Sequence, residues 1–217
     1  YFSYAQQYFN IHQKIITPSE VGCTLSHIQA LEAFLETEEE YCLILEDDVI
    51  GSDKAIAYIN DLVQQNKMNE FVLCGGQDGL NFWKYIMAKK NIDGLYFIPI
   101  FSIKFLFRTC SYLVNKNTAR YILKKQQQNF KVADAWHEIF KNSNISFAYL
   151  NLFNHPEDLS NSHIENERAI FYMDENNFFK RIYKQGIFWK IYNRIRNDLS
   201  KWVLILKGYK QIHKDKP

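Results

Sequence analysis

The sequence predicts an α/β fold, with a mostly parallel sheet flanked by helices and a basic amphipathic helical tail. Short apolar runs typical of buried strands, at 41–45 and 71–74, alternate with segments of helical periodicity, and this alternation predicts the sheet. The charge distribution predicts the tail, because residues 178–217 hold 11 Lys or Arg but two Asp or Glu. We therefore expect a domain over residues 1–168 and the tail over 169–217.

The composition is that of a folded protein with a real core. With 217 residues, of which 47% are hydrophobic, the chain is long enough to bury one domain. Its four cysteines lie far apart without a C-x-x-C pair, which disfavours a zinc site or disulfide framework and favours a reducing compartment. No apolar stretch approaches the roughly 20 residues of a spanning helix, so we expect the chain not to cross a membrane.

The first half of the chain predicts helix, strand, helix and strand. Ser26 followed by Gln29 has the spacing of a capping box, which predicts a helix that starts near Ser26 and ends near residues 38–40. The run YCLIL then predicts a buried strand, and a helix over 54–65 separates it from a second buried strand that ends at two glycines.

The second half predicts further strands and helices. Residues 95–114 are rich in aromatic and β-branched side chains, which favours one or two strands. A helix over 117–127, a short helix over 132–140 and a final strand over 146–153 follow from the apolar spacing. The tail alternates aromatic and aliphatic residues with Lys and Arg at helical spacing.

Three consecutive acids, Glu46, Asp47 and Asp48, follow the first predicted strand. In open α/β sheets, ligands bind at the carboxyl ends of strands. Neighbouring acids repel one another, and a hard divalent ion such as Mg²⁺ or Mn²⁺ relieves this repulsion, with a nucleotide diphosphate completing the coordination. Position alone leaves a solvated surface turn as an equal alternative.

The stretch from Glu20 to Val49 resembles the signature region of glycosyltransferase family 25, the lipooligosaccharide-biosynthesis galactosyltransferase type. Family members carry a G-C-x-x-S-H segment and then a strand that ends in E-D-D. The corresponding residues here are Gly22, Cys23, Ser26, His27, Glu46, Asp47 and Asp48. Weaker similarities over 108–123, 132–136 and 155–164 extend the match to residues 17–168 and leave the tail uncovered.

The resemblance implies a GT-A-like fold and a UDP-sugar donor, most often UDP-galactose. It implies transfer of a hexose, with inversion, to a lipooligosaccharide or lipopolysaccharide core, which is a glycolipid or oligosaccharide acceptor. Glu46 and Asp48 are then the expected metal ligands, with Mn²⁺ favoured over Mg²⁺, and Asp48 is the main contact. Ser26, His27, Glu46 and Asp47 are expected at the donor.

Inversion requires a base that takes the proton of the attacking hydroxyl. The resemblance suggests Asp134, which lies in an Ala-Asp-x-Trp element beside Trp136, a ring on which a sugar face could stack. The alternatives are that Asp134 caps a helix and that Trp136 belongs to the core. His155 and His163 are each candidates for a third metal ligand or plain loop histidines.

Two of the other site residues also have structural alternatives. Ser26 is a good helix cap, and His27 is equally suited to bonding a backbone carbonyl. Cys23 is expected as a small buried residue.

The tail has the composition of a helix on an anionic membrane surface. With a lipid-linked acceptor, it places the protein in the cytoplasm, peripheral at the inner face of the bacterial inner membrane. The alternative is that the tail packs its apolar face on the domain. We expect no nucleic-acid partner, because no recognised motif accompanies the charge.

Members of this family open with a strand and an Asn-Leu…Arg segment that contribute to the nucleotide pocket. Nothing similar precedes Tyr1. Either the chain is a fragment of the full protein or the segment has been lost. In the second case, the alternative function is a catalytically silent carbohydrate- or nucleotide-binding module that retains the fold.

Overall fold

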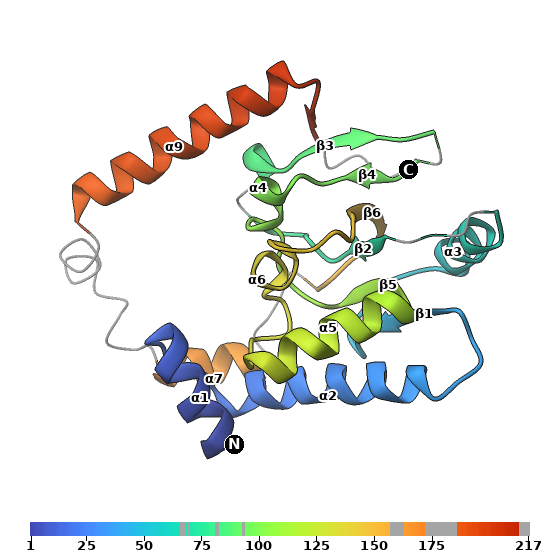
Figure 1. The fold of residues 1–217 in the computed structure, drawn as a ribbon, viewed down its shortest axis with the longest axis horizontal. Helices are drawn as coiled ribbons and strands as arrows, with labels where there is room; N and C mark the ends of the chain where they lie inside the picture. Colours follow the sequence, from blue (N-terminus) through green and yellow to red (C-terminus); the bar gives the residue numbers. More distant parts are fainter. Residues whose placement is uncertain are drawn as a thin grey trace.

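The computed structural model describes residues 1–65, 68, 70–80, 83–92, 94–156, 163–171 and 186–212. Helices surround one mixed sheet (Figure 1). The elements of the first half are α1 (Phe2–His12), α2 (Pro18–Leu35), β1 (Tyr41–Leu45), α3 (Asp53–Gln65), β2 (Phe71–Gly75), the 3₁₀ turn η1 (Trp83–Tyr85), β3 (Met87–Lys90) and β4 (Tyr96–Phe97). Those of the second half are α4 (Ile100–Ile103), β5 (Ser111–Asn115), α5 (Lys116–Gln128), α6 (Trp136–Phe140), β6 (Phe147–Phe153), α7 (His163–Phe171), α9 (Ile187–Leu206) and β7 (Lys210–Gln211).

The strand order is β1-β5-β2-β6-β4-β3-β7. Among the described strand pairs, β2 and β6 are the only parallel neighbours, so the expectation of a mostly parallel sheet is wrong. The reason is β5, which enters antiparallel between β1 and β2. Since β5 opposes both neighbours, β1, β2 and β6 still run in one direction and end at one edge of the sheet.

The two faces of the sheet bury alternate residues. Phe71 and Leu73 of β2 face a cluster formed with α2, α5 and α6, whereas Val72 and Cys74 face a cluster formed with α3. This period of two follows from the pleat of a strand. The domain therefore has three layers, with α2 and α5 on one face of the sheet and α3 on the other.

Strand β1 is less buried than its apolar sequence suggests. It lies at the end of the strand order, where its partner is β5. Its first four residues are half-buried, and Leu45 is exposed. An apolar run alone therefore predicted the strand correctly and its full burial wrongly.

Helix α2 begins eight residues before the predicted start. Its N-cap is Thr17, whose hydroxyl accepts the N–H of Glu20 while the Glu20 carboxylate accepts the N–H of Thr17. Pro18 follows in the first turn, where a proline is tolerated because its missing donor is not needed. Ser26 is thus an exposed residue within the helix rather than its cap.

The segment 95–114 contains a helix that the aromatic content did not predict. Strands β4 and β5 confirm two strands there, but Ile100–Ile103 form α4 after Pro99. The predicted helices at 54–65 and 117–127, and the strands at 71–74 and 146–153, are confirmed within a residue or two.

The tail returns to the sheet after α9. Its last strand, β7, pairs with β3, and the N–H of Ile212 donates to the carbonyl of Ile86. Ile212 is buried in the main cluster. None of the described helices has both the length and the hydrophobicity that crossing a bilayer requires.

Candidate active site

The site lies where β1, β2 and β6 end and where β5 begins. Glu46 follows β1, Asp78 lies in the turn after β2, and His155 follows β6. Arg108 and Thr109 precede β5, whose opposite direction brings its first residues to the same edge. Four segments distant in sequence are therefore neighbours, and the edge is the one that the acids were predicted to occupy.

Backbone hydrogen bonds hold the loop after β1 against the end of β6. Ile50 and Asn154 exchange two of them, with N···O distances of 2.9 and 2.8 Å. The N–H of Glu46 donates to the carbonyl of Cys110 at 2.9 Å. A side chain at Gly51 would meet the Phe153 ring at 2.6 Å, so a glycine is needed for this approach.

These bonds bring Glu46, Asp48 and His155 together. Ligand atoms of the three side chains lie within 4.8 Å of one another, and His155 Nε2 is 3.4 Å from Asp48 Oδ2. The Asp48 side chain is 47% exposed, whereas that of His155 is 11% exposed. The group therefore opens to solvent on the Asp48 side and is covered on the His155 side.

The hydrogen bond of His155 fixes which of its ring nitrogens faces the acids. Nδ1 lies 2.8 Å from the carbonyl oxygen of Pro156, which only accepts, so Nδ1 must carry a proton. In a neutral ring, the lone pair of Nε2 then points at the Asp48 carboxylate. A proton or a metal cation between these two acceptors makes their approach favourable.

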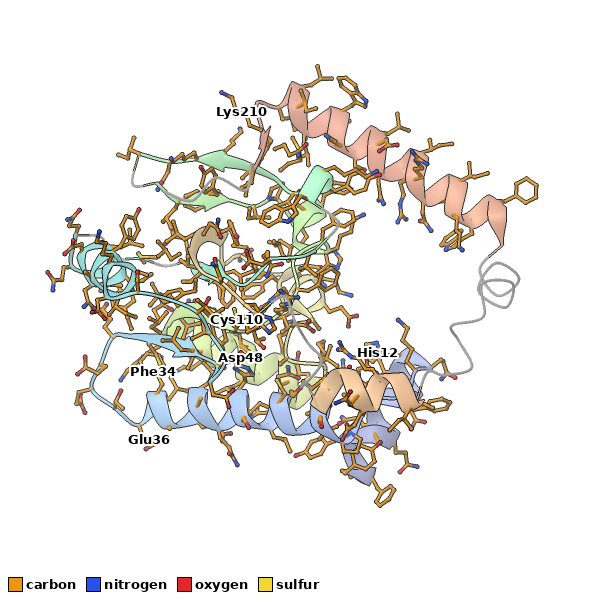
Figure 2. All side chains as sticks on the ribbon, turned by 180° about the vertical axis from the view of Figure 1, so that it is seen from behind. His12, Phe34, Glu36, Asp48, Cys110 and Lys210 are labelled. Atoms are coloured by element: carbon orange, nitrogen blue, oxygen red, sulfur yellow. The ribbon has the colours of Figure 1, made fainter. Side chains whose placement is uncertain are left out.

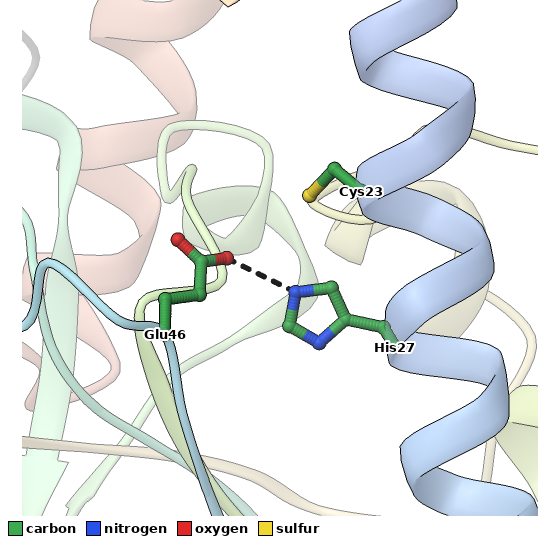
Figure 3. A group of neighbouring side chains, drawn as sticks. All are labelled: Cys23, His27 and Glu46. Carbon is green, nitrogen blue, oxygen red and sulfur yellow. Dashed lines mark hydrogen bonds and ion pairs between the residues drawn. The ribbon is translucent and has the colours of Figure 1, made fainter.

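Glu46 is positioned by two donors from other elements, of which Figure 3 shows His27. His27 of α2 approaches Glu46 Oε1 through Nε2 at 3.0 Å, and the Thr109 hydroxyl donates to the same oxygen. His27 Nδ1 is 2.9 Å from the hydroxyl of buried Tyr112. Because a carboxylate only accepts, His27 Nε2 donates and Nδ1 of the neutral ring accepts from Tyr112.

These contacts set the ionisation of Glu46 and its neighbours. Burial alone would raise the pKa of Glu46, but the hydrogen bonds from His27 and Thr109 and the charge interactions with His27 and His155 together outweigh burial and lower it. Burial raises the pKa of the Cys23 thiol to about 12, with the Glu46 charge adding to the effect. Glu46 is therefore an anion and Cys23 a neutral thiol at neutral pH.

Arg108 and Asp134 line a pocket at this edge of the sheet, together with Glu46 and His155. Arg108 has a φ of 63°, a left-handed conformation that is uncommon for a residue with a side chain. Its N–H donates to Asp134 Oδ2 at 3.1 Å, and its guanidinium donates to the carbonyls of Gly76 and Asp78. Burial raises the pKa of Asp134, and the Arg108 N–H partly opposes that rise.

The structure decides whether Asp134 caps a helix and whether Trp136 belongs to the core. The N-cap of α6 is Ala135, and Asp134 caps no helix because its carboxylate bonds Arg108 instead. Trp136 is 2% exposed, packs on Phe71, and donates through Nε1 to the carbonyl of Arg108. It belongs to the core, so the expectation of an exposed ring for sugar stacking is wrong.

The sequence did not single out Arg168 and Glu20, which also line the pocket. The Arg168 guanidinium donates to Glu20 Oε1 through Nε at 2.9 Å and through Nη2 at 2.7 Å. This ion pair joins α7 to the first turn of α2. The capping-box spacing of Thr17 and Glu20 was the available signal for Glu20, whereas no local pattern links Arg168 to it.

The remaining predicted residues lie less centrally. Asp47 is exposed and outside the group of close ligand atoms, and Ser26 does not line the pocket. His27 bonds two side chains rather than a backbone carbonyl. Cys23 is half-buried and lines the pocket instead of being fully buried. His163 begins α7, and its side chain lies outside the described residues.

Glu46, Asp48 and His155 thus form a group at the carboxyl edge of the sheet whose ligand atoms lie close enough together to hold a metal ion. The profile of glycosyltransferase family 25 (LPS biosynthesis protein) matches residues 2–136, which is more than half of the chain. The chain therefore belongs to this family of transferases, and its role is glycosyl transfer in lipopolysaccharide biosynthesis. Its substrates are accordingly a nucleotide sugar and a glycoconjugate acceptor. A comparison with curated proteins finds no match.

Proposed function

We propose that this chain transfers galactose from UDP-galactose to a lipooligosaccharide or lipopolysaccharide core, with inversion and with help from a divalent metal. The observation that carries the proposal is the meeting of Glu46, Asp48 and His155 beside a pocket that contains Asp134. The lipid of such an acceptor places the reaction at the cytoplasmic face of the inner membrane.

The donor atoms fit a divalent cation. Two ligands at about 2.1 Å from a metal lie at most about 4.2 Å apart, so the group, whose atoms lie within 4.8 Å, needs only small side-chain rotations. Two carboxylates and one imidazole favour Mn²⁺ over Mg²⁺, because Mg²⁺ prefers oxygen alone. When bound there, the ion would supply Lewis-acid stabilisation of the leaving diphosphate.

Residues of the chain hold the cation, take the proton and bind the donor. Glu46, held by His27 and Thr109, keeps one oriented charge at the cation. Asp134 is the base that takes the proton of the acceptor hydroxyl, and its raised pKa brings it closer to the neutral range where a base works best. We also assign Ser26 and Asp47 to the donor, as the family resemblance implies.

Arg108 and Arg168 give the pocket its positive charges. The Arg108 guanidinium is held by the carbonyls of Gly76 and Asp78, and Arg168 is held by Glu20. Both side chains line the same cavity of about 130 Å³. Since sites for drug-sized ligands span roughly 300–1,000 Å³, this cavity takes one sugar or phosphate group rather than a whole nucleotide sugar.

The experiment is a calorimetric titration of UDP with and without Mn²⁺. We expect binding that requires the metal in the unmodified chain, is lost in Asp48→Asn, and is kept in the control Asp61→Asn, whose carboxylate lies on the exposed face of α3. Failure of the unmodified chain to bind UDP with Mn²⁺ would overturn the donor assignment, and binding without metal would overturn the role of the cation.

Transfer itself separates the enzyme from a silent binding module. With UDP-galactose and a core oligosaccharide, we expect a product whose anomeric configuration, measured by NMR, is opposite to that of the donor. UDP binding without transfer to any core acceptor would favour the silent carbohydrate- or nucleotide-binding module. A faster reaction with UDP-glucose than with UDP-galactose would contradict the choice of sugar.

A further inference from the structure

Helix α9 exposes an apolar stripe along its whole length. Apolar residues three or four positions apart lie on one side of a helix. The members of this stripe are Phe188, Ile191, Ile195, Leu199, Trp202 and Leu206, which are between 50% and 86% exposed. In Figure 2, side chains of α9 project away from the body of the protein.

Another side of α9 faces the domain, and most of its half-buried residues are polar. Asn193, Asn197 and Ser200 are half-buried on that side. Asn197 Oδ1 accepts from Lys104 Nζ at 2.7 Å, and Asp198 Oδ1 accepts from the Tyr85 hydroxyl at 2.9 Å.

The C-terminal end of α9 is also held against the domain. Lys201 Nζ donates to Gln211 Oε1, and β7 adds the following residues to the sheet. The helix is therefore held through its polar side, the reverse of a helix that covers a core.

The domain already has a hydrophobic core that does not include this stripe, so the stripe is exposed apolar surface without a structural role in the domain. Contiguous exposed apolar surface marks a contact with a partner or a membrane. Two exposed cations, Arg194 and Arg196, stand on either side of Ile195 in the sequence and so flank the stripe. Trp202 and Tyr192 are amphipathic rings of the kind enriched at membrane interfaces. The groove between Phe101 and the helix extends the apolar surface.

We propose that α9 lies in the plane of an anionic lipid bilayer, with its apolar stripe among the acyl chains and its cations at the phosphates. The charge selects this occupant over a second copy of the chain. Two identical stripes would bring their flanking cations together, whereas anionic headgroups attract them. This docking deepens the proposed function, since it holds the enzyme where a lipid-linked acceptor resides, but the docking itself requires no transfer.

The test is co-sedimentation of the full chain with vesicles of phosphatidylcholine, with or without phosphatidylglycerol. We expect binding to the anionic vesicles. Replacing both Leu199 and Trp202 by Ser should lower the partition coefficient by at least about 100-fold, since each buried apolar side chain contributes roughly 1.5–3 kcal/mol. Phe2→Ser with Phe9→Ser is the matched control, because these exposed aromatic residues lie on α1.

A separate prediction concerns the contribution of the α9 cations to vesicle binding. Arg194→Gln with Arg196→Gln should lower binding to anionic vesicles about 30-fold, at roughly 1 kcal/mol for each charge, and should leave binding to pure phosphatidylcholine unchanged. High salt should have the same effect as this variant, because it screens the charges and leaves the apolar stripe intact.

The orientation of the helix is tested by lipids brominated in their acyl chains, which quench nearby tryptophan. Trp202 belongs to the stripe, whereas Trp189 does not. We expect quenching to persist in Trp189→Phe and to fall sharply in Trp202→Phe.

Three outcomes would overturn the proposal: equal quenching of the two rings, vesicle binding that survives Leu199→Ser with Trp202→Ser, and self-association of the chain in the absence of lipid. The α9 variants should keep metal-dependent UDP binding, so loss of docking and failure of the proposed function remain distinguishable.

Discussion

Glu46 and Asp134 line the same pocket, but their surroundings move their pKa values in opposite directions. Glu46 receives two side-chain hydrogen bonds that, together with the charge interactions with His27 and His155, favour its anion over the effect of burial. For Asp134, burial has the largest effect on the pKa, and it favours the protonated form. Separating the pKa values of two carboxylates is how a site assigns one to charge stabilisation and the other to proton transfer.

The raised pKa of Asp134 makes a prediction about stability. Below the ordinary aspartate pKa of 3.8, the group is protonated in both the folded and the unfolded chain and burial has little cost. As pH rises through the raised folded pKa, the buried charge lowers the free energy of unfolding. Asp134→Asn should therefore melt at a higher temperature than the unmodified chain at pH 7, and at an equal temperature below pH 3.8.

The same substitution should lower the transfer rate by about 10²–10⁴ because the base is lost. Unfolding curves by circular dichroism across pH, together with initial rates, check both effects. A variant that is less stable than the unmodified chain at pH 7, or one that keeps its activity, would contradict the role given to Asp134.

A second prediction at this scale concerns His27, which orients Glu46 by a hydrogen bond to Oε1. His27→Ala should weaken Mn²⁺ binding about 10–100-fold, the usual cost of losing a group that orients a ligand. His27→Gln, whose amide also donates a hydrogen bond, should restore part of it. Calorimetry with Mn²⁺ measures the effect, and Gln29→Ala on the exposed face of the same helix is the control. Equal affinities for His27→Ala and the control would remove His27 from the site.

At the scale of the element, the start of α2 is fixed by its capping box rather than by its apolar periodicity. Thr17→Ala removes the hydroxyl that accepts the Glu20 N–H, and should lower the free energy of unfolding by about 1 kcal/mol. Ser26→Ala should be neutral or slightly stabilising, because alanine is the better helix former within a helix. Urea unfolding compares the two, and a larger loss at Ser26 would place the start of the helix there.

The turn after β2 depends on a glycine for a different reason. Gly75 has a φ of 142°, and a side chain there would lie 2.0 Å from the carbonyl oxygen of Phe153. Gly79 also has a positive φ, but a side chain there would meet open space. Gly79→Ala should therefore cost only about 1–2 kcal/mol of conformational strain.

Gly75→Ala should cost more than Gly79→Ala, because β2 and the end of β6 would have to separate. It should also weaken Mn²⁺ binding, since the turn after β2 bonds the backbone of His155 through Asp78. Thermal unfolding and metal titration of the two variants check this, and equal effects would contradict it.

At the scale of the molecule, periodicity predicted most elements but not the direction of β5. Apolar alternation is the same whether a strand runs up or down, so the sequence supported a parallel sheet by its alternation of helices and strands. The chain instead passes through β3, β4 and α4 before β5 and returns in the opposite sense. The sequence left the position of Trp136 open for a similar reason, since only its packing on Phe71 shows that it is a core residue.

The site was predictable where its residues follow a strand in sequence. The acids at 46–48 and the candidate ligand His155 follow β1 and β6, and this placement is confirmed. Thr109 and Arg168 were missed because their partners, Glu46 and Glu20, are remote in the chain. The roles given to Asp134 and the cation stay predictions until they are measured.

The strand order has a mechanical consequence. Strands β1 and β6 are separated by β5 and β2, so their ends are three strand spacings, or about 14 Å, apart. Glu46 and His155 nevertheless bring their ligand atoms within 4.8 Å, because the loop after β1 crosses the ends of the intervening strands. A cation bound between Glu46 and His155 would link the two outer members of this set of four strands. Any change in the twist or spacing of the sheet beneath would then appear as a change in metal affinity.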